Sequence, residues 1–148
     1  MAAAKPKASA GWLVKSEPSV YPWSQLVREK KAIWDGVRNA QARNNLAAMK
    51  SGDRVLFYHS NEGKEIVGIA KVARTAYQDP TTDDPRWLVV ELAPSNPLAR
   101  PVTLAEIKAD PELRKIPLVT QSRLSVMPID ASAFARILEL SRPRASRK

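Results

Sequence analysis

Few side chains in this sequence are suited to acid–base or nucleophilic catalysis. His59 is the only histidine among 148 residues, and cysteine does not occur. Without cysteine, the sequence cannot provide a thiolate zinc site, a cysteine nucleophile or a disulfide. A Ser-His-Asp triad would have to use His59. Because an apolar stretch precedes His59, we favour a structural role for it. A single histidine cannot build a His-rich metal site, so we expect no metal, and none of the five glycines has the spacing of a phosphate-binding loop, so we do not expect nucleotide hydrolysis.

Two carboxylates, Glu17 and Asp35, occupy positions from which they could share a cleft. Both lie at the ends of predicted elements. A pair of carboxylates in one cleft supports acid–base catalysis, so an enzyme acting on RNA or DNA through Glu17 or Asp35 is one alternative. Ion pairs of Glu17 with Lys15 and of Asp35 with Arg38 explain the same residues equally well.

Aromatic side chains give a different indication. Trp12 and Trp23 fall in apolar patterns typical of a core, whereas Trp34, Tyr58 and Trp87 stand beside turns or at strand ends. An unstacked nucleobase is held by stacking on aromatic faces, while polar groups bind its hydrogen-bonding edge. The three outlying aromatics are therefore candidates for a base site. The candidate groups for the base edge are Ser16, Asn39 and Ser60.

The positive charge is unevenly distributed. The formal net charge is +9, and basic residues are concentrated at both ends of the sequence. Between Arg28 and Arg54 there are seven basic residues and three acidic ones. Because Asn39 is predicted to cap a helix in this region, unpaired backbone N–H groups near Arg38 would add to its attraction for anions. This internal cluster favours a nucleic-acid partner more than the terminal charges do.

The pattern of the chain predicts an α+β domain. Short apolar segments predict strands at 11–15, 54–59, 66–72, 87–92 and 124–127. Helices are expected after Pro22, after Asn39, after the capping box Thr103–Glu106 and after Asp130. We expect one domain at 11–140 between basic disordered tails at 1–10 and 141–148. No segment has the pattern of a secretion signal or a membrane span, so we expect a cytoplasmic protein without a membrane partner. Nothing in the sequence demands more than a monomer, which is the expected state.

Four blocks of sequence, in this order and spacing, resemble the EVE domain family. They are Trp12–Pro18, Trp34–Asn39 followed by Gln41–Asn44, Phe57–Ser60, and Ser122–Val126. The resemblance covers nearly the whole chain from Gly11 to Leu140. It implies a PUA-like fold, which is a small mixed barrel-like sheet of five or six strands with short helices packed around it, related to YTH and ASCH domains.

The resemblance also implies a function, and it implies no cofactor, since none belongs to the family. EVE domains are thought to be non-catalytic modules that bind DNA or RNA and recognise a modified base, such as modified cytosine or adenine. Lys15 and Ser16 match a Lys-Ser pair at the pocket of YTH domains, and Trp34 matches a tryptophan of the cage there. Arg38, Arg43 and Arg123 are assigned as phosphate contacts or as structural arginines. The predicted base-pocket residues are Lys15, Ser16, Glu17, Trp34, Val37, Asn39, Tyr58, His59, Ser60, Trp87, Leu124 and Ser125. A protein-interaction module that uses the same aromatic surface is a further alternative.

Overall fold

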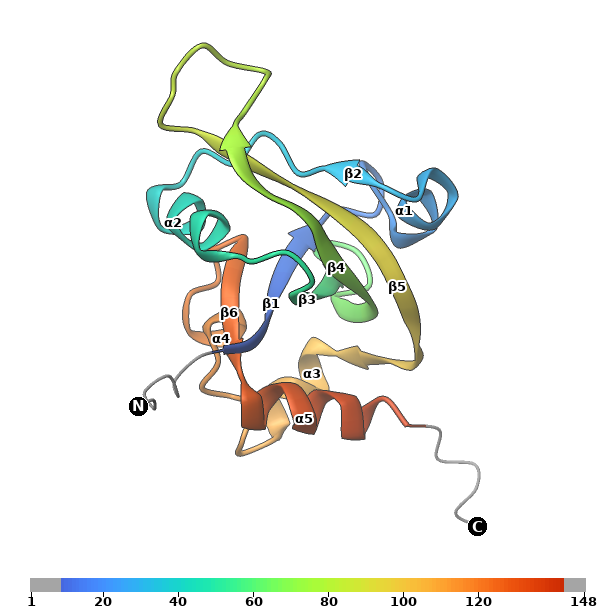
Figure 1. The fold of residues 1–148 in the computed structure, drawn as a ribbon. Helices are drawn as coiled ribbons and strands as arrows, with labels where there is room; N and C mark the ends of the chain where they lie inside the picture. Colours follow the sequence, from blue (N-terminus) through green and yellow to red (C-terminus); the bar gives the residue numbers. More distant parts are fainter. Residues whose placement is uncertain (1–8, 143–148) are drawn as a thin grey trace.

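A computed structural model describes residues 9–142 of the chain, which form one six-stranded mixed sheet with five short helices (Figure 1). The sheet order is β2-β5-β4-β3-β1-β6. The central strands β1 and β3 are parallel, and the other neighbouring strands are antiparallel. The strands are β1 (Ser9–Ser16), β2 (Ala32–Ile33), β3 (Arg54–His59), β4 (Glu65–Gln78), β5 (Leu88–Thr103) and β6 (Val126–Asp130).

Helices pack around the sheet, and helix α2 contacts β4, β5 and β6. The loop between β4 and β5 stands at the opposite end of the molecule from α3 and α5 (Figure 1). In α5, Phe134 and Ile137 are buried in the core, as expected for an amphipathic helix whose first turn is capped by Asp130. The helices are α1 (Trp23–Glu29), α2 (Ala40–Ala48), α3 (Leu104–Ala109), α4 (Pro117–Thr120) and α5 (Ala131–Leu140).

Helix α1 is fixed closely against the sheet. A Cβ atom added to Gly68 of β4 would lie 2.5 Å from the ring of Trp23, so only glycine allows this approach. The backbone N–H of Trp23 donates to Nε2 of His59 at 3.1 Å. The Trp23 ring also meets Phe57 edge-on at 5.4 Å between centroids. Trp23 thus packs in the core, as expected, and His59 makes the structural contact that we favoured for it, although it was also predicted as a base-pocket residue.

The α+β class and the mixed six-stranded sheet confirm the predicted fold class, although the sheet does not close into a barrel. The edge strands β2 and β6 are not paired with each other. The caps predicted at Asn39, Thr103 and Asp130 are all formed, each accepting a hydrogen bond from its helix. β2 and α4 were not predicted, β4 and β5 are longer than expected, and β6 begins at Val126 rather than Leu124.

The predicted tails fall mostly outside the described residues, which exclude 1–8 and 143–148. Ser9 and Ala10, assigned to the tail by the sequence, belong to β1. Within residues 9–142, no helix has both the length and the apolar character needed to cross a bilayer.

Candidate functional site

A cavity of about 490 Å³ lies beyond the end of β1, and we call it the first cavity. One side is formed by the end of β1 and the turn that follows it, the other by β2 and the loop up to Arg38, and Ser125 completes it. Two exposed apolar side chains, Val20 (71% exposed) and Ile33 (47% exposed), line it. Exposed aliphatic side chains beside a polar cavity are available to contact an apolar part of a ligand.

Trp34 and Tyr21 form the aromatic part of the first cavity. Their rings meet edge-on with centroids 6.1 Å apart, and Trp34 meets the buried Phe57 in the same way at 5.7 Å. The backbone N–H of Trp34 donates to the carbonyl of Val90 at 2.8 Å. The hydroxyl of Tyr21 donates to Glu29 at 2.8 Å, and burial, reinforced by this bond, raises the pKa of Tyr21 to about 12. Both rings are therefore held in place, and the phenol stays neutral at ordinary pH.

A buried carboxylate outside the first cavity fixes the loop that lines it. Asp79, 0% exposed, accepts hydrogen bonds from the Gly36 N–H (2.9 Å) and the Arg38 guanidinium (3.0 Å). Burial alone would raise the pKa of Asp79, but hydrogen bonds from Thr81, Gly36 and Arg38 lower it well below its usual range. Gly36 has φ +80°, a conformation that strains other residues. The loop conformation thus depends on one glycine and one ionised carboxylate.

The polar residues of the first cavity divide into bonded and free groups. Lys15 donates from Nζ to the carbonyl of Ser122 at 2.7 Å and from its backbone N–H to the carbonyl of Ser125 at 3.0 Å. Burial lowers the pKa of Lys15. Glu17 and Asp35 both line the cavity, but neither is within ion-pair distance of a cation in the described part of the chain. The ion pairs expected with Lys15 and Arg38 are therefore absent there, and two carboxylates are free to accept hydrogen bonds from a ligand.

Residues 10–140 match the EVE domain family. The chain belongs to this family. Thymocyte nuclear protein 1 of Mus musculus is 35% identical over an alignment of 169 residues. The alignment covers 91% of this chain and 75% of the mouse protein. The resemblance seen in the sequence is thus confirmed.

Solved structures share the fold of this EVE domain. The NMR structure of Rpa0253 from Rhodopseudomonas palustris has a TM-score of 0.85 and 47% identity, covering 89% of this chain and 92% of that one. The human THYN1 protein, solved in complex with DNA containing 5-methylcytosine, has a TM-score of 0.84 and 32% identity, with coverages of 91% and 99%. An ASCH protein of Zymomonas mobilis, at 12% identity and a TM-score of 0.58, shares the fold alone.

The structure of this EVE domain brings together about half of the predicted site residues. The first cavity contains Lys15, Ser16, Glu17, Trp34, Val37, Arg38 and Ser125. Tyr58 is instead buried in the core, at 3% exposed, and His59 accepts the bond from Trp23. Ser60 donates its backbone N–H to the carbonyl of Ser16 at 2.9 Å and does not line the cavity.

Trp87 lies outside the first cavity, among arginine side chains. The guanidinium carbons of Arg38, Arg43 and Arg86 are 5.7, 5.6 and 5.5 Å from its ring centroid. Such contacts hold the β4/β5 loop against the start of α2 through cation–π attraction. Arg43 also donates to its neighbour Asn44, at 3.1 and 3.3 Å. Among the three predicted phosphate contacts, Arg38 and Arg43 therefore have structural partners.

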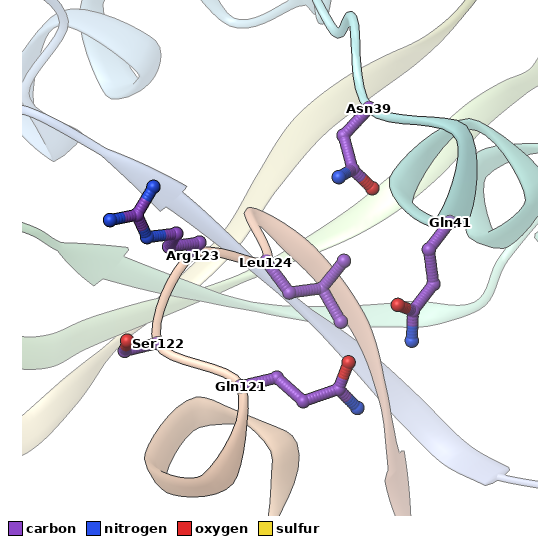
Figure 2. Close-up of a pocket in the computed structure, with 6 residues that line it drawn as sticks. All are labelled: Asn39, Gln41, Gln121, Ser122, Arg123 and Leu124. Carbon is purple, nitrogen blue, oxygen red and sulfur yellow. The ribbon is translucent and has the colours of Figure 1, made fainter.

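A second cavity of about 350 Å³ contains the remaining predicted residues of this EVE domain (Figure 2). It is lined by Asn39, Gln41, Gln121, Ser122, Arg123 and Leu124. The side-chain oxygen of Asn39 accepts the N–H of Ala42 at 2.8 Å, so this oxygen is used as the helix cap. Leu124 is buried and Arg123 is exposed.

Tyr21, Val20 and Ile33 line the first cavity but were missed by sequence reasoning. The segment from Ser19 to Pro22 looked like a connection between a strand and a helix. The sequence feature that could have indicated this part of the cavity is the pair Val20 and Tyr21, which stands between two prolines in an otherwise polar turn. Exposed apolar residues in a short turn indicate a surface with a binding role.

Proposed function

We propose that this EVE domain binds nucleic acid and accepts one modified base, with 5-methylcytosine in DNA as the first candidate, into the first cavity. The observation that carries the proposal is an aromatic-walled cavity with free carboxylates, in a chain of the same fold as the human protein in complex with 5-methylcytosine DNA. Binding without covalent change is the simplest use of these groups.

The first cavity offers a ring-binding surface. A base that leaves its stack loses the contacts of its neighbours, and aromatic side chains replace them at about 1 to 3 kcal/mol per base. Trp34 is held by its backbone bond and by Phe57, so its ring needs no rearrangement to receive a base. A preformed wall of this kind lowers the entropic cost of binding.

The free polar groups of the first cavity suit the edge of cytosine. Its exocyclic amino group is a donor, and Glu or Asp side chains accept from it. Glu17 and Asp35 both line the cavity without a cationic partner among the described residues. The ammonium group of Lys15 and the hydroxyl of Ser125 supply donors for the carbonyl and ring nitrogen of the same base.

Selection for a methyl group would come from apolar contact. Ile33, Val37 and Trp34 line the first cavity and present carbon surface to it. Burying one methyl group contributes about 0.8 kcal/mol, which corresponds to about fourfold in affinity. The preference for a modified base is therefore expected to be modest, and phosphate contacts would supply most of the affinity.

Titrating fluorescent oligonucleotides that differ by a single 5-methyl group tests this proposal. Wild-type protein should bind the methylated strand about threefold to tenfold more tightly than the unmethylated strand. Trp34→Ala should weaken binding to the methylated strand at least about tenfold. The ratio of the affinities for the methylated and unmethylated strands should then be close to one. An N6-methyladenine strand and RNA of the same sequence identify the preferred base and carrier.

A control aromatic variant separates site effects from general destabilisation. Tyr77 of β4 bonds Glu91 and lies under Arg74, outside the first cavity. Tyr77→Ala should leave the methyl preference unchanged when both variants are compared at temperatures where circular dichroism shows them folded. Equal affinity of the wild-type protein for all strands would refute the proposal.

One observation favours a second candidate, an enzyme acting on nucleic acid. Glu17 and Asp35 line the same cavity, as the sequence suggested, and a carboxylate in a cleft can act as a general base. Incubating the protein with oligonucleotides and weighing the products by mass spectrometry decides between the two. A mass change that disappears in Glu17→Gln or Asp35→Asn would favour the enzyme, and unchanged masses with retained binding would favour the binding module.

A further inference from the structure

The second cavity adjoins the first along two separate segments of the chain. Arg38 lines the first cavity and the next residue, Asn39, lines the second. In the same way, Ser125 lines the first and Leu124 the second. Consecutive Cα atoms are about 3.8 Å apart, so the two cavities lie next to each other at both of these segments. A chain molecule with one unit in the first cavity would place its next unit at the second.

The side chains of the second cavity are suited to a planar polar group. In Figure 2 the side chains of Gln41, Gln121 and Leu124 are directed toward one another, and the amide of Asn39 approaches from the start of α2. Within residues 9–142 the two glutamine amides make no hydrogen bond to another residue. Each amide offers a donor pair and an acceptor side by side, which is the pattern that pairs with the edge of a nucleobase. Leu124 supplies an apolar surface between them.

The segment between the cavities is firmly held and carries a positive charge. Lys15 bonds the carbonyls of both Ser122 and Ser125, so the segment from one to the other is tied to the end of β1. Figure 2 shows the guanidinium of Arg123 directed away from Gln41 and Gln121, toward β1. No carboxylate in the described part of the chain pairs with it. An exposed arginine at this place is suited to the phosphate that joins two neighbouring nucleotides.

We propose that the second cavity binds the nucleobase next to the modified base in the same strand, with the amides of Gln41 and Gln121 on its edge and Arg123 on the linking phosphate. This rests on the proposed function, because the first cavity must hold the neighbouring base. The domain then recognises a modified base together with its sequence context. Glutamine pairs with the N6 and N7 atoms of adenine, so adenine is the expected preference.

Strands that vary only in the bases flanking one 5-methylcytosine test this inference. The wild-type protein should prefer one base over the least favoured base by at least about fivefold at one of the two flanking positions. The double variant Gln41→Ala, Gln121→Ala should lose this flanking preference and keep the ratio between methylated and unmethylated strands. Gln25→Ala is the matched control, because Gln25 bonds Glu29 in α1 and lines neither cavity.

The outcomes of this experiment separate the two proposals. A wild-type protein without any flanking preference, or a preference that survives in the double variant, would overturn the role of the second cavity. The wild-type protein could bind methylated and unmethylated strands equally but show a flanking preference that the double variant loses. This result would overturn the proposed recognition of the modified base and would retain base binding at the second cavity. Loss of the flanking preference in Gln25→Ala would assign the effect to general disturbance and would also overturn the inference.

Discussion

Asp79 lies outside the first cavity but bonds to two residues that line it. The carboxylate accepts from the Gly36 N–H and from Arg38, and all of it is buried. The Gly36 and Arg38 bonds both end on Oδ2, and Oδ1 accepts from Thr81. Asp79→Asn replaces one of these two oxygens with a donor, so the bonds at that oxygen are lost, and the charge of Arg38 loses its partner. We expect a loss of about 2 kcal/mol in the free energy of unfolding and weaker binding of the modified strand. Urea denaturation and oligonucleotide titration measure the two effects.

Asp84→Asn is the matched control for this change. Asp84 is in the same loop and pairs with Arg86 at 2.7 Å, but the arginine side chain is 69% exposed. A solvent-exposed pair contributes about 0 to 1 kcal/mol, so the control should unfold nearly like the wild type. Similar losses in both variants would mean that the burial of Asp79 has no special consequence.

The predicted phosphate contacts divide into two kinds of arginine. Arg38 bonds a buried carboxylate, whereas Arg123 is exposed and pairs with no described carboxylate. Arg38→Gln should therefore lower stability, and Arg123→Gln should leave stability within about 0.5 kcal/mol of the wild type. If Arg123 contacts a phosphate, its loss weakens all strands alike and reduces the salt slope of binding by about one. Melting curves measure the stability of the two variants, and titrations at several salt concentrations measure the salt slope of binding. An unchanged salt slope for Arg123→Gln would show that Arg123 does not contact a phosphate.

At the scale of elements, the sequence predicted those features that depend on neighbouring residues. Asn39, Thr103 and Asp130 each cap a helix because a short polar side chain reaches an N–H within the same turn. The length of β5 could not be predicted in this way, because Pro94, Pro97 and Pro101 suggest a break. These prolines are tolerated because β2 pairs with β5 only at Glu91 and Leu92, so β5 has one neighbour beyond that point.

The first cavity was predicted only in part, because some of its residues are close in sequence and others meet only in the folded chain. Lys15, Ser16 and Trp34 were identified from family blocks, and the structure places them together. Tyr21 joins them only because the turn after β1 brings it against Trp34, a contact that depends on the tertiary fold. Tyr58 was placed in the site because it stands near a strand end, but β3 is buried on both faces from Val55 to Tyr58. Strand periodicity does not show which face of a curved sheet is covered.

The start of helix α1 depends on the protonation of His59. Its Nε2 accepts the N–H of Trp23, which requires the neutral ring. Burial lowers the pKa of His59, and the nearby Glu65 opposes this shift only in part. The folded pKa therefore lies below the unfolded value of about 6.5, and the unfolded chain binds the proton more readily. This contribution to stability is complete above about pH 6.5 and is lost as the pH falls through the folded pKa.

Unfolding measured from about pH 8 to about pH 5 tests this dependence. The free energy of unfolding of the wild type should decrease across the acidic part of this range. His59→Gln should show a flatter profile there, because the chain has no other histidine and no cysteine. Parallel profiles for the two proteins would show that His59 keeps its ordinary pKa in the folded state.

At the scale of the whole molecule, β1 starts at the end of the sheet that lies away from the first cavity. β1 begins beside Asp130, where α5 starts, and its other end at Ser16 reaches the first cavity. The helix α5 lies at the end of the molecule opposite the β4/β5 loop (Figure 1). The segment before residue 9 thus joins the end of β1 away from the first cavity, and the last residues of the chain follow α5. The segments that precede β1 and follow α5 contribute six of the 24 basic residues of the chain: Lys5, Lys7, Arg142, Arg144, Arg147 and Lys148.

The terminal charges should strengthen nucleic-acid binding without affecting base selection. The Debye length is about 30 Å at 0.01 M salt and about 8 Å at 0.15 M, so charges that stay farther than this from the bound strand act only at low salt. Replacing Arg144, Arg147 and Lys148 by alanine should weaken binding to methylated and unmethylated strands equally at low salt, and hardly at all near 0.15 M. The control variant replaces Lys108, Arg114 and Lys115, which are exposed residues in α3 and in the segment after it, and removes the same charge. It should likewise weaken binding to both strands equally at low salt. Loss of the methyl preference in the C-terminal variant would show instead that these residues contact the strand at the site itself.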